Sequence, residues 1–574
     1  MLLLLLACVN TKGEGTPDSG ETGYLWHDTS IATGDDTGDT DNTVTGETGD
    51  TGETGDTGPI DTGGPDLLAL DVYPASMIVH PGATFSLRVV ATQLDGARGD
   101  DLGATFAAAD PAIATVDATG LVTAIAEGAT TIDVSLGGLV VTAAVEVRAD
   151  GVATVTVVDA RDGSPLEGAR VALPSTEPVK TDASGVALLP VADGGAITFT
   201  AWIDDDWNAV TVCQTVGRSF TVPIWPKDVA VRSATLYGTV DFSGVTDPTW
   251  EELAVGFASA SVQGSLAAIR LDDLFADERA ITVIGIDVEA PSNLFVEGAQ
   301  EDYYATSLPE DVGVWGLAGP IAIADAGDSL NGTGDALELL VDNLDAMSWD
   351  WNGPTVAVAD ATTSLDLAPS LPFDGTASLT LPALSLGFQG TEDLFVLVTE
   401  ERADAGFVTV GLGLGTDSVE VKTVADGSVG DSLGRAVLAY GQVGGIGSGG
   451  ATAASVGRED GGGAVVFPAL PDIASFPVFD AATRDVAVDV DADADFVRVR
   501  FYDNRNRVHD LFAPGDWAGV VPNAVNDFHF AQAQREIVAV ETEDGAYEGW
   551  MAEGSLDPDA LTSARAVART IVDP

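Results

Sequence analysis

The chain has 574 residues, more than one hydrophobic core supports, so its length predicts roughly three to five domains of about 100 to 200 residues each. Its 90 acidic and 24 basic residues give a formal net charge of −66, which opposes adhesion to nucleic acid and to anionic lipid headgroups. The two cysteines are too few for a disulfide-stapled fold, so stability has to come from packing.

The composition favours β structure. Hydrophobic residues make up 45% of the chain, and 66 glycines and 27 prolines supply the turns that many short strands need. We expect an all-β protein with a disordered acidic N-terminal stalk, several β-sandwich domains and a short C-terminal helix. The acidic surface is compatible with divalent-cation binding or tolerance of high salt, but we favour a simply solvated surface under a composition bias.

The first eight residues, MLLLLLAC, end in Leu5-Leu6-Ala7-Cys8. This ending resembles the lipobox of bacterial lipoproteins, which implies cleavage before Cys8, acylation of its thiol and attachment to a membrane through lipid. Two features depart from the usual signal: no Lys or Arg precedes the leucines, and five leucines are shorter than an ordinary apolar segment. Val9, where such lipoproteins can carry an Asp, is compatible with sorting to the outer membrane.

Residues 9–66 form the expected stalk. They hold almost only Gly, Thr, Asp and Glu, including the near-repeat GETGDTGETGDTG at residues 46–58. Such a segment cannot bury enough apolar surface to offset its ordering entropy, so it is predicted to be a disordered linker. As a flexible coil it would span about 40 Å and hold the following domains clear of a bilayer.

Residues 67–148 are predicted to form a β-sandwich. Alternating apolar and polar residues at 85–89 and 131–134 indicate half-buried strands, and Thr119-Gly120 and Gly137-Gly138 indicate turns. The stretch 110–128, DPAIATVDATGLVTAIAEG, resembles the central signature of group 2 bacterial immunoglobulin-like domains. Such domains occur in surface proteins, often as spacers, and the resemblance implies no catalytic residue.

Residues 150–226 are predicted to form a second, smaller sandwich, with a strand at 152–157 and a turn at 182–185. The phrases at 162–171 and 180–185 resemble the carboxypeptidase regulatory-like domain, an accessory fold without peptidase chemistry. No histidine lies between His80 and His509, so no His-containing zinc site is expected here.

The rest of the chain resembles no family. It is predicted to contain β-rich domains at 227–440 and 451–574, and the sequence does not decide whether these are one domain or two. Strand-like alternation recurs at 234–242, 280–288, 355–359, 394–399 and 407–412. A boundary is expected within the glycine-rich segment 441–450. At the end, Asp557 and Pro558 can start a helix over residues 560–568.

One short motif suggests hydrolase chemistry. Residues 430–434, GDSLG, have the spacing of a nucleophile elbow and resemble the motif of GDSL hydrolases, with Ser432 as nucleophile. Catalysis would require His509 or His529 within about 3 Å of the Ser432 hydroxyl. Because the preceding residues form a turn rather than an apolar strand, we expect no catalytic residue.

We expect no metal site, and a calcium site is a weaker alternative. Asp489, Asp491, Asp493 and Asp495 have the spacing of the first half of a calcium loop of the EF-hand type. The position of its glycine holds Ala494, and that of its final glutamate holds Arg500. A solvated strand face with a change of register near residues 493–495 is the alternative explanation.

The remaining candidates are expected to be core. Cys213 lies in an apolar alternation and is predicted to be an inert buried thiol. Trp349 and Trp351 would share one face of a strand, and Trp202 and Trp207 lie close to an acidic triplet. Exposed pairs of this kind stack on sugars, whereas buried ones stabilise a core, which we favour here.

The sequence therefore favours a non-catalytic lipoprotein of the cell envelope, extracytoplasmic and anchored through Cys8, most consistently in the outer membrane. Its β-sandwich domains would serve as spacers and a binding platform for an unknown protein or glycan, without nucleic acid and without a cofactor other than the weak calcium candidate. An adhesin or carbohydrate-binding protein is the alternative, and a secreted serine hydrolase is a third.

Overall fold

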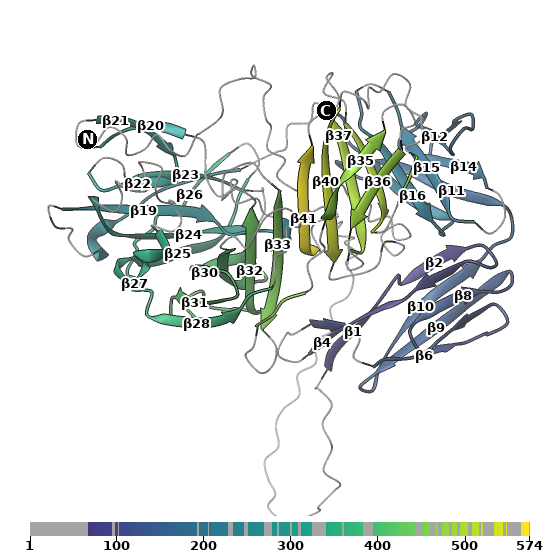
Figure 1. The fold of residues 1–574 in the computed structure, drawn as a ribbon, viewed down its shortest axis with the longest axis horizontal. Coiled ribbons are helices and arrows are strands. Elements are labelled where there is room, and N and C mark those ends of the chain that lie inside the picture. The colour runs from purple at the N-terminus through teal and green to yellow at the C-terminus, as the bar shows by residue number, and fades with distance from the viewer. Residues whose placement is uncertain are drawn as a thin grey trace, which may run out of the picture.

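A computed structural model of the chain consists almost entirely of β-strands, which confirms the predicted fold class (Figure 1). The structure describes residues 67–93, 98–100, 103–191, 195–204, 206–227, 234–245, 249, 251–268, 278–283, 286–298, 301–307, 311–323, 340–358, 361–382, 394–442, 451–459, 465–468, 473–480, 485–490, 494–502, 508–515, 518–520, 533–542, 547 and 564–572.

The first module, residues 67–148, is a sandwich of short sheets that are antiparallel except for the parallel pair of β2 and β10. Its strands are β1 (Leu67–Tyr73), β2 (Ser76–Val79), β3 (Thr84–Ser86), β4 (Arg88–Gln93), β5 (Arg98–Asp100), β6 (Thr105–Ala108), β7 (Ala114–Val116), β8 (Leu121–Ala124), β9 (Gly128–Leu136) and β10 (Leu139–Val147). The expected turn at Gly137 and Gly138 joins β9 to β10, and both glycines have positive φ. Alternate side chains of β9 and β10, such as Ile132 and Val145, fill the core.

The second module, residues 150–226, packs two sheets face to face. Its strands are β11 (Val152–Asp159), β12 (Arg170–Ala172), β13 (Val179–Lys180), β14 (Val186–Pro190), β15 (Ile197–Trp202), β16 (Ala209–Thr215) and β17 (Ser219–Ile224). Sheet β14-β11-β17 covers the strands β13-β12-β15-β16. Phe199 and Phe220 meet between them with ring centroids 5.0 Å apart. The predicted small sandwich is therefore present.

The third region, residues 234–466, has three stacked sheets. Its elements are β18 (Ala234–Thr239), η1 (Phe242–Gly244), β19 (Glu252–Ala260), η2 (Leu266–Ala268), β20 (Glu278–Val283), β21 (Ile286–Pro291), β22 (Leu294–Val296), β23 (Asp302–Ser307), β24 (Asp311–Ala322), η4 (Leu344–Ala346), β25 (Ser348–Val356), β26 (Thr362–Ser364), β27 (Leu371–Pro372), β28 (Gly375–Thr380), β29 (Leu394–Arg402), β30 (Gly406–Gly415), β31 (Ser418–Thr423), β32 (Gly434–Gln442), β33 (Thr452–Glu459) and β34 (Val465–Val466).

The middle sheet of this region, β22-β19-β24-β25-β27, is covered on both faces. One face packs on β23-β18-β26 through side chains such as Leu236 and Val314. The other packs on β29 and β30 through Trp315, Leu317 and Val408. Coverage on both faces explains why β24 is a nearly continuous buried apolar run rather than an alternating one.

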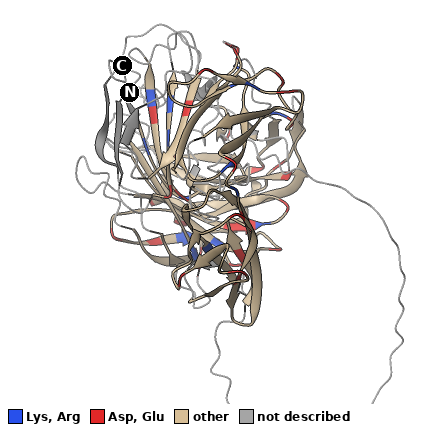
Figure 2. Ribbon diagram, turned by 90° about the vertical axis from the view of Figure 1, so that its right-hand side faces the viewer, with Lys and Arg blue, Asp and Glu red and all other residues tan. Residues whose placement is uncertain are grey.

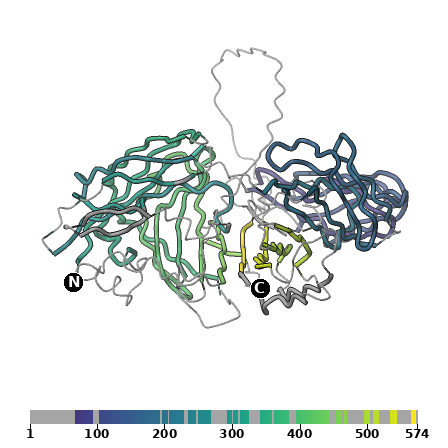
Figure 3. Tube along the Cα trace, turned by 90° about the horizontal axis from the view of Figure 1, so that it is seen from above, coloured from purple at the N-terminus to yellow at the C-terminus, as the bar shows by residue number. Residues whose placement is uncertain are grey.

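The C-terminal strands, residues 473–572, connect the other parts. They are β35 (Ile473–Asp480), β36 (Asp485–Val490), β37 (Phe496–Tyr502), β38 (Val508–Pro514), β39 (Ala518–Val520), β40 (Gln534–Thr542) and β41 (Ala564–Val572). Among the described residues, β37, β38, β40 and β41 complete a 15-stranded sheet, the long sheet, in the order β13-β12-β15-β16-β38-β37-β40-β41-β33-β32-β29-β30-β31-β28, with β34 beside β33. Strands β35, β36 and β39 form a separate sheet. Figure 3 shows the yellow C-terminal strands between the teal-green third region and the blue second module.

The predicted C-terminal helix is wrong for the residues that the structure describes. Residues 564–568 belong to β41, which pairs antiparallel with both β40 and β33. Alanines favour a helix locally, but a strand here completes the hydrogen bonding of two neighbours and buries Val567 and Ala568 on opposite faces. The expected helix start, residues 557–563, lies outside the described residues.

The expected boundary at 441–450 lies between two paired strands. β32 ends at Gln442 and β33 begins at Thr452, and the two run antiparallel from Gln442 opposite Thr452 to Ala436 opposite Arg458. The strands on both sides of this segment thus belong to one sheet rather than to two separate cores. Within the described part of the chain, no helix is long and apolar enough to cross a membrane.

Candidate functional site

The long sheet contains a contact between distant parts of the sequence, which we call the seam. In it, β16 of the second module pairs in parallel with β38 of the C-terminal strands, from Ala209 opposite His509 to Val212 opposite Phe512. About 300 residues separate the two strands in the chain. The seam therefore joins by main-chain pairing two parts that the sequence predicts as separate modules.

A chain of buried hydrogen bonds crosses the seam. The hydroxyls of Thr200 and Thr211, on neighbouring strands β15 and β16, lie 2.8 Å apart, and Thr211 Oγ1 lies 2.7 Å from His509 Nε2. All three side chains are fully buried. Burial lowers the pKa of His509 to about 4, so the imidazole is neutral at neutral pH. An uncharged imidazole is suited to this dry position because it needs no counter-ion.

Tyr547 closes the same seam where the parallel pairing ends. Its hydroxyl accepts a hydrogen bond from the amide of Cys213 at 3.1 Å and can donate to the carbonyl oxygens of Cys213 and Phe512. One side chain thus contacts the main chain of both β16 and β38. The Cys213 thiol is completely buried and its pKa is raised by burial, which confirms the prediction that this cysteine lies in the core.

The first module is held to both neighbours. Arg88 Nη1 of β4 lies 2.9 Å from Asp495 Oδ2, just before β37, and this oxygen also accepts hydrogen bonds from the amide and hydroxyl of Thr542. On the other side, the amide of Arg218 donates to the carbonyl of Ile78 at 2.8 Å. Figure 1 shows β1 and β4 beneath the yellow strands β40 and β41. The modules therefore form one connected body.

A buried ionic ladder runs across the C-terminal strands of the long sheet. Arg500 of β37 makes two hydrogen bonds with Asp510 of β38, at 2.6 and 3.0 Å. Glu536 of β40 receives Arg498 of β37 at 3.0 Å and lies 3.2 Å from Arg569 of β41. Although burial opposes its charge, the Asp510 carboxylate raises the pKa of Arg500. Figure 2 shows blue and red segments on neighbouring strands.

The structure does not bring Ser432 and His509 together. Ser432 is exposed in the turn before β32, where its hydroxyl lies 3.3 Å from the amide and carbonyl of Gly434. His509 lies in β38, and four strands of the long sheet separate β38 from β32. At about 4.8 Å per strand this is a lateral separation of roughly 24 Å. His529 lies outside the described residues.

Glu400 lies within hydrogen-bonding reach of the Ser432 hydroxyl. It lies in β29, its side chain is buried, and burial raises the pKa of its carboxyl, while Arg435, the Gly427 amide and the Ser432 hydroxyl lower it. The sequence offered no signal for Glu400, because only the pairing of β29 with β32 brings it to this turn.

The four aspartates of the calcium candidate are divided. Asp489 lies in β36 opposite Ser475, and Asp491 and Asp493 lie outside the described residues. Asp495 contacts Arg88 and Thr542, as described above. Among the described residues, no group of three or more His, Cys, Asp or Glu side chains could hold a metal ion. Calcium at the complete set of four remains a prediction.

The tryptophans lie mainly in the core. Trp349 is 1% exposed and its indole N–H donates to the carbonyl of Thr409 at 3.0 Å, and Trp202 is also buried. Trp351 packs on the same core as Trp349, and Trp207 lies under the Arg161 guanidinium. The prediction of core tryptophans is confirmed for Trp202 and Trp349.

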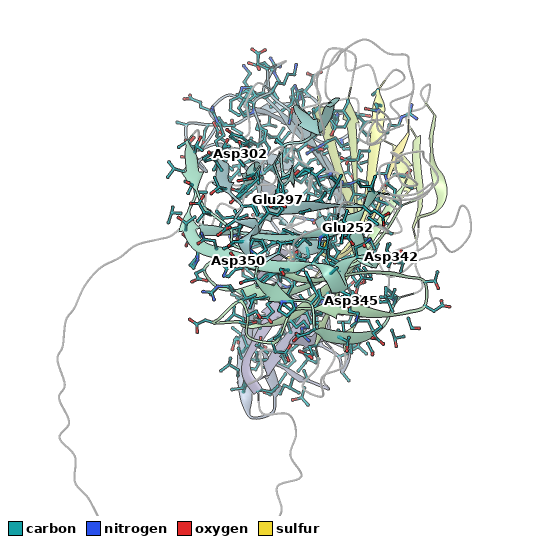
Figure 4. The ribbon with its side chains drawn as sticks, turned by 90° about the vertical axis from the view of Figure 1, so that its left-hand side faces the viewer. Glu252, Glu297, Asp302, Asp342, Asp345 and Asp350 are labelled. Carbon is teal, nitrogen blue, oxygen red and sulfur yellow. The ribbon has the colours of Figure 1, made fainter. Side chains whose placement is uncertain are left out.

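Acidic side chains spread over the side of the third region shown in Figure 4. Several of them have local structural partners: Glu252 accepts from the Thr249 amide at 2.8 Å, Asp350 accepts from the Ala368 amide at 2.6 Å, and Asp345 pairs with Lys422 at 2.8 Å. These contacts support the interpretation of the acidic composition as solvated surface.

Cys8, the predicted lipidation site, lies outside the described residues. The residues that hold the modules together, Arg88, Thr211, His509 and Tyr547, were not predicted from the sequence. Each contacts a partner about 300 or more residues away, and no local pattern encodes such a contact. Nothing in the sequence around His509 indicated that its side chain is buried.

Comparison with known proteins supports part of this description. Residues 102–149 match the bacterial Ig-like domain family, which confirms an Ig-like fold for that part of the first module. No curated protein matches the chain.

Among solved structures, domains 5–6 of the S-layer protein SbsC share 15% identity over 44% of this chain and 91% of theirs, with a TM-score of 0.15. The Bacillus anthracis TIE protein shares 10% identity over 69% and 70% of the two chains, with a TM-score of 0.12. A tetra-tandem repeat of a large adhesion protein shares 13% identity over 87% and 99%, with a TM-score of 0.10. At scores this far below 0.5, these similarities establish neither a shared overall fold nor a function.

Proposed function

We propose that the protein is a non-catalytic spacer and binding platform of the bacterial cell envelope, anchored through lipid on Cys8. The single observation that carries this proposal is the seam, because main-chain pairing of β16 with β38 fixes the second module against the C-terminal strands. A rigid body is suited to presenting a surface at a fixed distance and orientation.

Two further features support the location. Ig-like domains, matched here by residues 102–149, are extracytoplasmic spacers in many surface proteins, and the Leu5-Leu6-Ala7-Cys8 ending resembles a lipobox. The acidic residues 9–66 would then act as the flexible tether between the lipid and the platform. Outer-membrane sorting is part of this proposal, as is a protein or glycan partner.

The alternatives have less support. A hydrolase would need Ser432 beside an imidazole, and the long sheet keeps His509 roughly 24 Å away from β32. A glycan-binding role based on tryptophan stacking would need exposed rings, and Trp202 and Trp349 are buried.

Metabolic labelling with a fatty-acid analogue tests the anchor. The wild-type chain should be labelled and fractionate with membranes, whereas Cys8→Ala should lose both the label and the membrane association. Cys213→Ala is the matched control, because it removes the only other thiol and should leave the label in place. A wild-type chain without label would contradict the lipid anchor, and label retained in Cys8→Ala would contradict the assignment to this residue.

A further inference from the structure

The outer face of the small sheet β23-β18-β26 carries an ordered set of side chains. Alternate residues of β18 and β23, such as Leu236 and Tyr303, point into the core of the third region. The residues between them therefore point away from it. Across the three strands these outer residues form rows, and the middle row consists of Tyr304, Tyr237 and Ser364.

The two tyrosines of the middle row are direct cross-strand neighbours. Their ring centroids are 5.1 Å apart with the planes tilted by 44°, so the rings make one continuous aromatic surface. Tyr304 is 39% exposed and Tyr237 is half-buried. Aromatic side chains are costly to leave in water, and here an exposed and a half-buried ring lie together on a sheet face.

Carboxylates flank the rings in the next row. Asp302 lies opposite Thr239 on β23, and Asp366 follows β26 on the other side of Thr239. The amide and hydroxyl of Thr239 hold Asp366 Oδ1 at 2.9 and 2.8 Å, which lowers the pKa of this carboxyl and keeps it ionised. Residues two apart along a strand are separated by about 7 Å, so the carboxylates lie within reach of a group stacked on the rings.

The geometry points to a binding site for an arginine-bearing segment of a protein partner on this face, which we call the tyrosine–aspartate face. A guanidinium stacks on tyrosine rings and donates hydrogen bonds to carboxylates at the same time. The net charge of −66 adds a long-range attraction for basic partners and disfavours anionic ones. This inference rests on the proposed role as a binding platform and specifies the chemistry of its partner.

The test measures binding of a fluorescent peptide of Gly, Ser and Arg to the full chain by fluorescence anisotropy. The wild type should bind, and binding should weaken as salt increases. Tyr304→Thr, which keeps a strand-forming residue, and Asp366→Asn should each weaken binding at least about tenfold. The same peptide with citrulline in place of arginine should not bind, because it keeps the shape and loses the charge.

Glu297→Gln is the matched control. Glu297 is exposed and lies just after β22 in the same region. Its substitution by Gln also removes one negative charge, so this variant should change binding less than about twofold. An equal loss in Glu297→Gln would overturn the site in favour of general electrostatic attraction. Absence of peptide binding, or binding of a neutral oligosaccharide instead, would also overturn it. None of these outcomes changes the labelling of Cys8, so failure of this inference is distinguishable from failure of the envelope role.

Discussion

His509 lies where an ionised imidazole has no water to stabilise it. Its Nε2 contacts Thr211 at 2.7 Å, Phe501 lies edge-on with ring centroids 6.3 Å apart, and the side chain is fully buried. Asp510 is adjacent and favours the charged form, but burial outweighs it and lowers the pKa to about 4. The seam thus contains a titratable group whose neutral form belongs to the folded state.

This shift predicts acid sensitivity. The unfolded chain takes up the His509 proton near pH 6.5, whereas the folded chain does so only near pH 4. Between these values the unfolded state binds more protons, so the free energy of unfolding falls as the pH is lowered, by about 3 kcal/mol in total from this group. Chemical denaturation at pH 7 and pH 4.5 of the wild type and His509→Gln measures the effect.

The free energy of unfolding should change more steeply with pH in the wild type than in His509→Gln. His509→Gln lacks the titrating group, so its stability should depend less on pH within this window. Equal pH dependence in both chains would show that His509 does not contribute.

Tyr547 gives a second prediction at the residue scale. Tyr547→Phe removes the hydroxyl that contacts the main chain of Cys213 and Phe512, and it leaves buried polar groups without that partner. We expect a loss of about 1 to 3 kcal/mol in the free energy of unfolding, measured by urea denaturation. Tyr304→Phe, at an exposed position, should cost less than about 0.5 kcal/mol. Equal effects of the two substitutions would rule out a special role for Tyr547.

At the scale of elements, the ionic ladder links four neighbouring strands. Arg500 and Asp510 pair β37 with β38, and Glu536 joins β40 to both β37 and β41. In the antiparallel register Arg500 lies directly opposite Asp510, whereas Arg498 and Arg569 lie diagonal to Glu536. A shift of register by one residue would move these charges to the apolar opposite face, so the ladder favours a single register.

A double substitution tests the ladder. Asp510→Ala leaves the buried Arg500 without its carboxylate and should lower the free energy of unfolding by about 3 to 5 kcal/mol. Arg500→Met combined with Asp510→Leu removes both charges and should restore most of that loss, as measured by urea denaturation. A double variant that is no more stable than Asp510→Ala would mean that the pair does not act through its charge.

The elements differ in how far the sequence predicts them. Alternation and turn residues predicted β9, β11 and β29, because both signals are local. The prediction of a helix at 560–568 was wrong for residues 564–568, which belong to β41. There, pairing with β40 and β33 outweighs the helix propensity of alanine. The seam and the ladder depend on contacts between residues far apart in the chain, which composition and periodicity do not encode.

At the scale of the whole molecule, one sheet is shared by the second module, the C-terminal strands and the third region. Arg88 connects the first module to Asp495 of the C-terminal strands, and Ile78 connects it to Arg218 of the second module. Shared strands restrict relative motion more than linkers do. Such a body would hold the tyrosine–aspartate face at a fixed position relative to the first module.

Hydrogen–deuterium exchange of the full chain tests this account most directly. The amides of residues 209–212 and 509–512 should exchange as slowly as those of β40, which is paired on both sides. β28, the last strand of the long sheet, provides the internal reference for an edge. Exchange at 209–212 as fast as in β28 would mean that β16 is an open edge, and it would contradict a single rigid platform.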